Sequence, residues 1–214
     1  MRDLILKMSV SADGFVGGPN GEIEWLLKTI DDSVAAWTID KLWKAGVHIM
    51  GSRTFNDMAL YWPTSAEPFA PPMNAIPKIV FSRKGALQPP SAEQTTGAFK
   101  DATKMARDLG FKTSISPDAS TWDNVPVLSG DLAAEIQRLK EQEGAPILAH
   151  GGAGFAQSLV RTGLIDEYQL LIHPVMLGKG LPLFTTLTAP MYLRLMSSTN
   201  FKSGVIANIY RPVK

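Results

Sequence analysis

Short apolar segments of strand length alternate with amphipathic helical segments along most of this sequence, and no other feature limits the possible folds as strongly. The helical segment 31–46 has acidic residues in its first turn, lysines near its end and a glycine as its stop, which is the polarity that a helix dipole favours. We predict strands at 4–10, 47–50, 77–83, 146–150, 167–177, 192–199 and 204–211, and helices at 31–46, 52–61, 131–144 and from about residue 155.

The last two predicted strands follow one another without a helix between them. Strands separated by helices normally form a parallel sheet, whereas consecutive strands of alternating polarity form an antiparallel pair. We therefore expect an α/β fold with a central, mostly parallel sheet, helices on both faces and an antiparallel C-terminal edge. Such a sheet binds its ligands beyond the carboxyl ends of the strands.

The length of 214 residues suits one well-buried α/β core, so we expect a single domain over residues 1–214. The stretch 88–120 mixes Pro, Ser, Thr and Gly and carries one short helical pattern near 102–109. We interpret 88–120 as an insertion or a flap.

Net charge and composition limit the kinds of molecule that the chain can bind and the compartment in which we expect it. The net charge of +1 and the absence of runs of like charge favour neither nucleic acid nor an anionic membrane as a partner. The N-terminal apolar patch is broken by Lys7, so it resembles a first strand rather than a signal peptide or a membrane span. The chain has no cysteine, which excludes disulfides and thiolate metal sites and fits the cytoplasm as its compartment.

Three glycines stand where the predicted strand 146–150 passes into a helix: Gly151, Gly152 and Gly154 in "GGAGF". A helix N-terminus presents unpaired N–H groups and a partial positive charge, and a glycine lets a phosphate approach them closely. The alternative is a turn that only packs a helix against a strand, since the full dinucleotide fingerprint is missing.

Two further strand ends carry residues suited to anions. "MGSRTF" places hydroxyl groups, a guanidinium and backbone N–H groups at the start of a helix, and "FSRKG" follows another strand. Taken singly, each arginine is explained as a solvated surface residue, and each serine or threonine as an ordinary helix cap. Together with the glycines they predict a pyrophosphate and one extra phosphate, which is NADPH rather than NADH. The residues concerned are Gly51, Ser52, Arg53, Thr54, Ser82 and Arg83.

These segments resemble the dihydrofolate-reductase-like family that includes the C-terminal reductase domain of bifunctional riboflavin-biosynthesis deaminase-reductases. The matching pieces are "SVSADGFVGGPNGEIEW", "IMGSRTF", "KIVFSR" and "LKEQEGAPILAHGGAGFAQSLVRTGLIDEYQLLIHPVMLGKGLPLF", and the last is the most specific. The resemblance implies a three-layer fold and a cytosolic, NADPH-using reductase, commonly a homodimer, of the stand-alone single-domain type.

The resemblance also implies roles for particular residues. Asp13 would lie in the loop beside the nicotinamide and the substrate, and Trp25 in the wall of the substrate site. The adenosine end with its 2′-phosphate would lie near Ser52, Arg53, Thr54, Ser82 and Arg83, and the pyrophosphate on Gly151, Gly152 and Gly154.

Two departures concern the substrate. Dihydrofolate reductases resemble one another in a proline-containing segment before the pterin-binding carboxylate, but "WLLKTIDD" lacks the proline and places Asp31 and Asp32 later. Riboflavin-pathway reductases resemble one another in an acidic residue before the paired glycines, where this chain has His150. The zinc deaminase that often accompanies the reductase domain needs thiolate ligands, so any deaminase step belongs to another polypeptide.

A hydride-transfer enzyme also needs a group that supplies or relays a proton. We consider Asp13, Asp31 and His150 for this role; the alternatives are a turn residue, an acidic helix start and a packed histidine. Asp32 could bind the substrate edge, and Trp62, in a proline-rich loop, either closes over a planar substrate or caps the core. His48, His150 and His173 form no metal-ligand pattern in the sequence.

The leading hypothesis is an NADPH-dependent reductase of a heterocycle or its ribosyl adduct, above all the riboflavin-pathway pyrimidine. The alternatives are a dihydrofolate-reductase-like pterin reductase and a non-catalytic NADPH-binding module. A homodimer is expected because the exposed edge of the terminal antiparallel strands needs covering.

Overall fold

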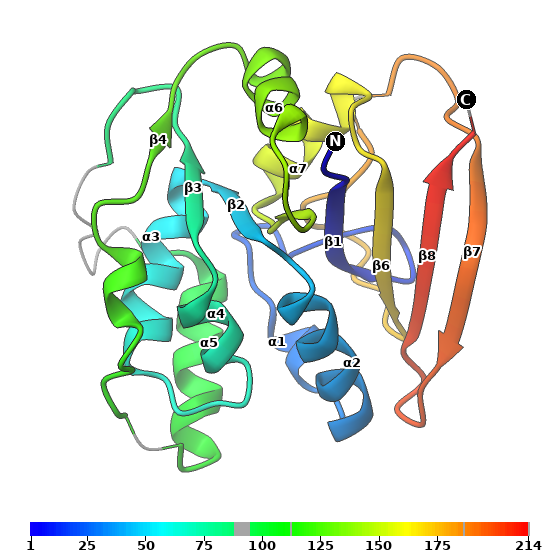
Figure 1. The fold of residues 1–214 in the computed structure, drawn as a ribbon. Helices are drawn as coiled ribbons and strands as arrows, with labels where there is room; N and C mark the ends of the chain where they lie inside the picture. Colours follow the sequence, from blue (N-terminus) through cyan, green and yellow to red (C-terminus); the bar gives the residue numbers. More distant parts are fainter. Residues whose placement is uncertain (88–94, 112, 186, 214) are drawn as a thin grey trace.

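The computed structural model describes residues 1–87, 95–111, 113–185 and 187–213 (Figure 1). Its centre is a sheet of eight strands in the order β4-β3-β2-β5-β1-β6-β8-β7. The strands are β1 Leu4–Ser11, β2 Val47–Gly51, β3 Lys78–Phe81, β4 Val127–Leu128, β5 Ile147–Ala149, β6 Glu167–His173, β7 Leu193–Asn200 and β8 Ile206–Pro212.

The strand pairing agrees with the predicted sheet. Strands β4, β3, β2, β5, β1 and β6 are parallel to their neighbours, and β8 and β7 complete the sheet as an antiparallel edge. The α/β fold class predicted from the sequence is therefore confirmed. The carboxyl ends of six parallel strands meet at one edge of the sheet, and the loops that follow them come together there.

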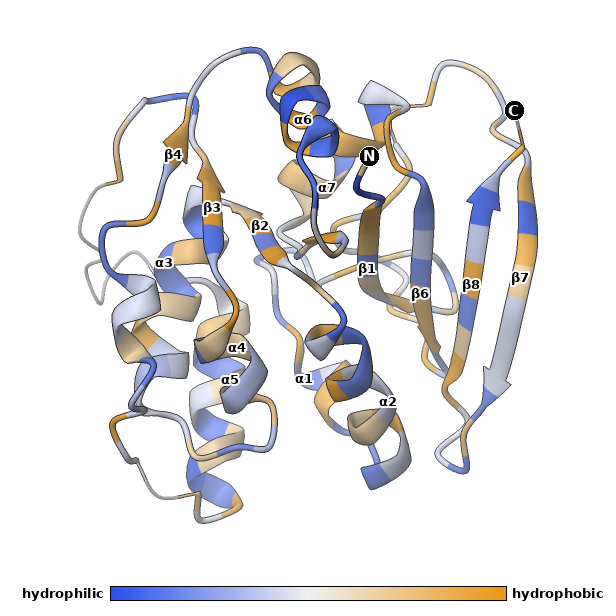
Figure 2. Cartoon of the chain, viewed as in Figure 1, coloured by the Kyte–Doolittle hydropathy of each residue, from blue (hydrophilic) through white to orange (hydrophobic). Residues whose placement is uncertain are grey.

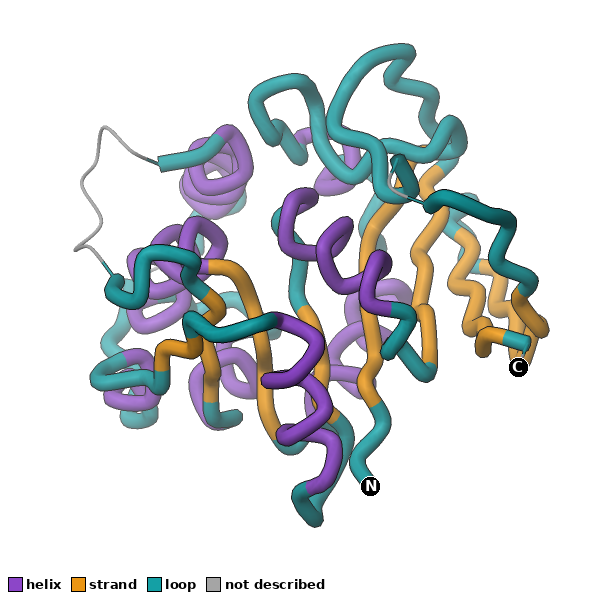
Figure 3. Tube along the Cα trace, turned by 90° about the horizontal axis from the view of Figure 1, so that it is seen from above, coloured by secondary structure: helices purple, strands orange, loops and turns teal. Residues whose placement is uncertain are grey.

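Helices cover both faces of the sheet, which gives three layers (Figure 3). One core cluster packs α6 and α7 against β1 and β5, and a second packs α2, α3 and α4 against the other face. The helices are α1 Glu24–Leu27, α2 Asp32–Trp43, α3 Ser52–Tyr61, α4 Ala70–Ala75, α5 Gly97–Asp108, α6 Leu132–Glu141 and α7 Ala153–Thr162, with 3-10 turns η1 Trp62–Thr64 and η3 Ala119–Trp122.

Hydrophobic residues concentrate on the inner strands, whereas β7 carries mostly polar residues and is exposed along most of its length (Figure 2). On β1 the buried residues Leu4, Leu6, Met8 and Val10 alternate with partly exposed ones, so one face of the strand enters the core beneath α6 and α7. The opposite face of β1 points toward the side of α2. This alternation places Lys7 on the α2 side.

Several element boundaries differ from the sequence prediction. The predicted strand 167–177 ends at His173, because Pro174 cannot donate a ladder hydrogen bond. In the predicted insertion, α5 begins at Gly97, capped by the Thr96 hydroxyl, and is longer than the helix predicted near 102–109. Residues 88–94 and 112 of that insertion lie outside the described residues. The two-residue strand β4 was not predicted, since so short a segment has no periodicity.

Within the described residues, no helix combines the length and the apolar character needed to cross a membrane.

Candidate nucleotide and substrate site

The glycine turn after β5 lies directly against the start of α3. A Cβ atom built on Gly152 would stand 2.6 Å from Thr54 Oγ1, and the φ of Gly152 is +37°, a value that other residues rarely adopt. A Cβ on Gly151 would stand 3.0 Å from Met8 Cε, whereas nothing lies within 4 Å of such an atom on Gly154. Gly152 is therefore required by its φ and its close packing, Gly151 is only tight against the flexible end of Met8, and Gly154 faces open space.

Helix α7, which begins at this turn, and helix α3, which begins beside it, both lack side-chain caps. The N-cap residues of α3 and α7 are Gly51 and Gly152, and neither helix start receives a side-chain hydrogen bond. By contrast, Asp31, Thr96 and Asp131 cap α2, α5 and α6. Two sets of unpaired backbone N–H groups thus lie side by side at the carboxyl edge of the sheet, which is a suitable arrangement for binding an anion.

Phe155 packs between the end of β3, the third predicted anion-binding strand end, and the start of α3. Its ring packs on that of Phe81 with the centroids 5.4 Å apart, and its Cβ is 3.2 Å from the position that a Cβ of Gly51 would take. The strand end that carries Ser82 and Arg83 is therefore held beside the starts of α3 and α7.

The charged side chains at this edge are free to reach a ligand. Arg53 and Arg83 are both exposed, and Ser52 and Thr54 are partly exposed. Ser82 is buried, and its hydroxyl accepts a hydrogen bond from Lys84 N at 3.3 Å. Ser82 therefore shapes the loop, while Arg53 and Arg83 offer guanidinium groups at its rim.

Asp13 joins two loops at the ends of β1 and β6. Its carboxylate accepts hydrogen bonds from the backbone of Leu177 at 3.0 Å and Gly178 at 2.7 Å, and from the hydroxyl of Ser11 at 2.6 Å. The bond from Ser11, followed by that from Gly178, holds the pKa of Asp13 below its usual value. The carboxylate is thus ionised and bound to backbone groups at neutral pH.

Asp31 fixes the start of α2. It accepts hydrogen bonds from Ser33 Oγ at 2.6 Å, Val34 N at 2.9 Å and Ser203 N at 3.1 Å, the last in the turn between β7 and β8. These bonds, with that from Ser33 the largest cause, lower the pKa of Asp31 to about 2. The neighbouring Asp32 is exposed as the first residue of α2.

The two predicted tryptophans lie in different parts of the molecule. Trp25 packs edge-on against His173, at the end of β6, with the ring centroids 5.3 Å apart. Trp62 instead contacts Tyr61, accepts a hydrogen bond from Asn74 at its carbonyl and packs on the core cluster beneath α3 and α4. The structure therefore brings Trp25, but not Trp62, to the ends of β1 and β6.

A polar cluster, formed by the buried His48 and the partly exposed Lys7 and His150, lies on the α2 side of the sheet. Lys7 and His150 directly follow the paired residues Leu6 and Ala149 of β1 and β5, so they lie side by side. The rings of His48 and His150 are in edge-to-face contact, with the centroids 4.4 Å apart. Within the described part of the chain, the ring nitrogens of His48 and the Nε2 of His150 make no hydrogen bond of normal geometry, and a looser hydrogen bond with the Leu42 backbone acts on the pKa of His48.

Burial sets the protonation of this cluster. It lowers the pKa of Lys7 from 10.5 to about 8, and that of His48 from 6.5 to about 3. Burial also lowers the pKa of His150 well below its usual value, and the neighbouring His48 and Lys7 add to the effect. Near pH 7 both rings are therefore neutral and Lys7 is the group in the cluster that carries a proton to give.

The sequence analysis treated Lys7 only as an interruption of an apolar strand. The available signal was a lysine in the middle of a core strand, only a few residues before "SADG". Its proximity to His48 and His150 depends on the sheet order, which the sequence does not give. Among the described residues, no three His, Cys, Asp or Glu side chains form a group suited to a metal ion.

The mainly parallel sheet, with its antiparallel edge and two uncapped helices, defines a class of protein. It is the dihydrofolate-reductase-like class: a dihydrofolate reductase from Enterococcus faecalis, complexed with NADP(H), superposes with a TM-score of 0.57 at 11% identity, over 99% of this chain and 97% of that one. Within this class, the chain belongs to the RibD C-terminal domain family, whose model matches residues 2–207. The family resemblance noted from the sequence is thereby confirmed.

The chain is also similar to two other proteins over nearly its whole length. The protein YyaP of Bacillus subtilis is 28% identical over 210 residues, which cover 98% of this chain and 94% of YyaP. The Thermotoga maritima diaminohydroxyphosphoribosylaminopyrimidine deaminase/5-amino-6-(5-phosphoribosylamino)uracil reductase superposes with a TM-score of 0.64 at 16% identity, over 99% of this chain and 57% of that one.

Proposed function

We propose that this protein is an NADPH-dependent reductase of the riboflavin-biosynthesis type, acting on a ribosylated pyrimidine such as 5-amino-6-(5-phosphoribosylamino)uracil. The observation that carries the proposal is the meeting of two uncapped helix N-termini at the contact between Gly152 and Thr54. Unpaired N–H groups of two helices can bind two neighbouring phosphate groups, as a dinucleotide requires.

The chain's own residues fit the parts of NADPH. The turn of Gly151, Gly152 and Gly154 suits the pyrophosphate, because Gly154 has open space where a Cβ would stand and Gly152 takes a positive φ that a residue with a Cβ rarely adopts. Ser52, Arg53 and Thr54, with Ser82 and Arg83 on the next strand end, suit the adenosine side with its 2′-phosphate. The exposure of both arginines supports this assignment.

The substrate lies, in this proposal, between the ends of β1 and β6 and the polar cluster. Asp13 holds the loop that flanks the reacting carbon, Trp25 forms an apolar wall, and Asp31 and Asp32 border the site at the start of α2. Bound NADPH would supply a hydride. That hydride would reduce C1 of the ribosyl group, and the ring oxygen released from C1 would then need a proton from the protein to give a ribityl chain.

Lys7 is the proposed proton donor for this oxygen. Burial lowers the pKa of its ammonium to about 8, so it can give its proton near neutral pH. The neutral His150 beside it can accept a proton or relay one. Asp13 is less suited, since its carboxylate is already bound to Leu177 and Gly178.

We further propose a cytoplasmic homodimer that covers β7. This edge strand exposes about half of the surface of Leu195 and of Met196, 52% in each case. Exposed apolar side chains on an edge strand form a surface that a second copy can cover by pairing or packing.

The cofactor assignment predicts a selective loss of NADPH affinity in Arg53→Ala. Loss of a charge-assisted bond to the 2′-phosphate should raise the Kd for NADPH about tenfold or more, with the Kd for NADH changed by less than about twofold. Fluorescence titration measures both constants, and Arg138→Ala, an exposed arginine on α6, serves as the control. If the unaltered protein binds neither nucleotide, the reductase proposal is wrong.

The proton-donor assignment predicts that Lys7→Met binds NADPH normally but reduces the pyrimidine about a hundredfold more slowly. In the unaltered protein, the rate should fall as pH rises through about 8, because the Lys7 ammonium loses its proton there. Single-turnover oxidation of NADPH measures the rate, and Lys7→Arg should move this loss to higher pH. An unchanged pH profile in Lys7→Met would assign the donor elsewhere.

Tight NADPH binding without turnover on pyrimidine or dihydrofolate would identify a non-catalytic module.

The dimer is tested by sedimentation equilibrium at micromolar concentration. We expect a dimer for the unaltered protein and a monomer for Leu195→Lys with Met196→Lys, since two buried charges oppose association. The unfolding midpoint of this double variant should stay close to that of the unaltered chain, because both side chains are about half exposed. A monomeric unaltered protein contradicts the proposal.

A further inference from the structure

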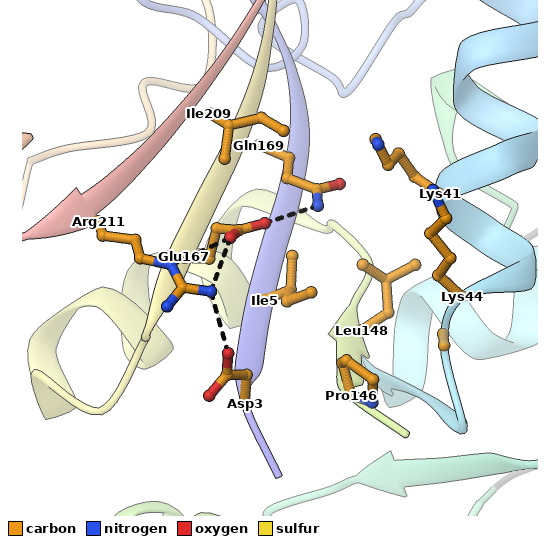
Figure 4. A pocket seen from close by; sticks show the side chains of 11 residues that line it. Asp3, Ile5, Lys41, Lys44, Pro146, Leu148, Glu167, Gln169, Ile209 and Arg211 are labelled. Atoms are coloured by element: carbon orange, nitrogen blue, oxygen red, sulfur yellow. Dashed lines mark hydrogen bonds and ion pairs between the residues drawn. The ribbon is translucent and has the colours of Figure 1, made fainter. Parts of the chain in front are cut away.

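A pocket lies at the amino ends of the strands, opposite to the glycine turn. Its volume is about 240 Å³, and it opens between α2 and the sheet. Ile5, Leu148 and Ile209, from β1, β5 and β8, give it an apolar floor (Figure 4). The volume is below the roughly 300–1,000 Å³ of sites for drug-sized ligands, so it suits a smaller molecule than a dinucleotide.

The two sides of this pocket carry opposite charge. Lys41 and Lys44 lie on the side of α2, and both pair with the carboxylate of Asp40, at 3.2 and 2.7 Å. Two ammonium groups thus share one carboxylate, and this side keeps a positive charge. The opposite wall of the pocket is formed by Asp3, just before β1, by Glu167 on β6 and by Arg211 on β8 (Figure 4).

On the facing side, two carboxylates share one guanidinium. Arg211 Nη2 lies 3.2 Å from both Asp3 Oδ2 and Glu167 Oε2. With one cation between two anions, this side keeps a negative charge. The pocket therefore separates a cationic wall from an anionic wall across an apolar floor.

Gln169 supplies an acceptor without a partner at the inner end of the pocket. The residue is 4% exposed, and its Nε2 donates a hydrogen bond to Glu167 Oε1 at 2.9 Å. This bond fixes the orientation of the amide and leaves Gln169 Oε1 buried with no partner in the described structure. A buried acceptor without a partner is costly, so it indicates a place for a ligand's N–H donor.

We propose that this pocket binds a small zwitterion of the α-amino-acid class with an apolar side chain. Its ammonium group would donate to Gln169 Oε1 and lie near Glu167, and its carboxylate would face Lys41 and Lys44. The side chain would pack on the apolar floor. The inference does not depend on nucleotide binding, because the pocket opens at the amino ends of the strands, away from the glycine turn. Gln169 at its inner end is paired with Lys7 of the polar cluster, so the test measures binding without nucleotide.

Calorimetric titration without nucleotide tests the proposal with L-valine, L-leucine and L-phenylalanine as probes. We expect saturable binding of at least one of them. For L-leucine, the analogues isocaproate, which lacks the amine, and isoamylamine, which lacks the carboxylate, should each bind about tenfold more weakly or worse, since each leaves one wall without its partner.

Variants locate the binding site. Lys41→Gln combined with Lys44→Gln should weaken binding about tenfold, and Gln169→Met should weaken it similarly by removing the acceptor. Lys28→Gln is the matched control, because Lys28 forms the same kind of exposed i,i+4 ion pair, with Glu24, outside the pocket. Circular dichroism confirms that each variant is folded.

Three results would overturn the proposal. They are no saturable binding of any probe up to millimolar concentration, equal binding of isocaproate, which would indicate a plain anion site, and unchanged binding in the Lys41 and Lys44 double variant. None of these results bears on NADPH binding, so the failure of this proposal and that of the proposed reductase function are distinguishable.

Discussion

The contact between the backbone of Gly152 and the hydroxyl of Thr54 is the constraint on which the proposed nucleotide site depends. The turn after β5 lies so close to the start of α3 that a Cβ on Gly152 would stand 2.6 Å from Thr54 Oγ1, and the φ of Gly152 is positive. Because both turns open helices without side-chain caps, their unpaired N–H groups lie at one place. The parallel sheet supplies the framework, since β2 and β5 are adjacent and end at the same edge.

The polar cluster beneath α2 lowers the free energy of unfolding of the protein, because some of its polar atoms lack hydrogen bonds of normal geometry in the described structure. His48 is wholly buried and neither of its ring nitrogens makes such a bond, and Lys7 is placed where burial lowers its pKa to about 8. Unpaired buried polar atoms destabilise a fold by about 1–3 kcal/mol each. Such groups occur mainly where a bound molecule or a reaction uses them, and their position next to the glycine turn fits that interpretation.

Much of the fold was predictable because its signals are local. Alternating segments gave the parallel sheet and its antiparallel edge, and the glycines marked the turn after β5. The partners of the candidate side chains were not predictable, because they come from distant segments. Asp31 bonds to Ser203, Asp13 bonds to Gly178, and Lys7 lies beside His150 only through the strand order. A sequence pattern identifies such residues but not the bonds that already occupy them.

The most direct test of the account is amide chemical-shift mapping of the 15N-labelled protein during titration with NADPH. The unpaired N–H groups should donate hydrogen bonds to phosphate. We therefore expect the largest amide shift changes at residues 52–54 and 151–154, and smaller changes near Arg83. Shifts confined to the amino-end pocket around Gln169, or an unchanged spectrum at saturating NADPH, would contradict the claim that the two helix starts form the nucleotide site.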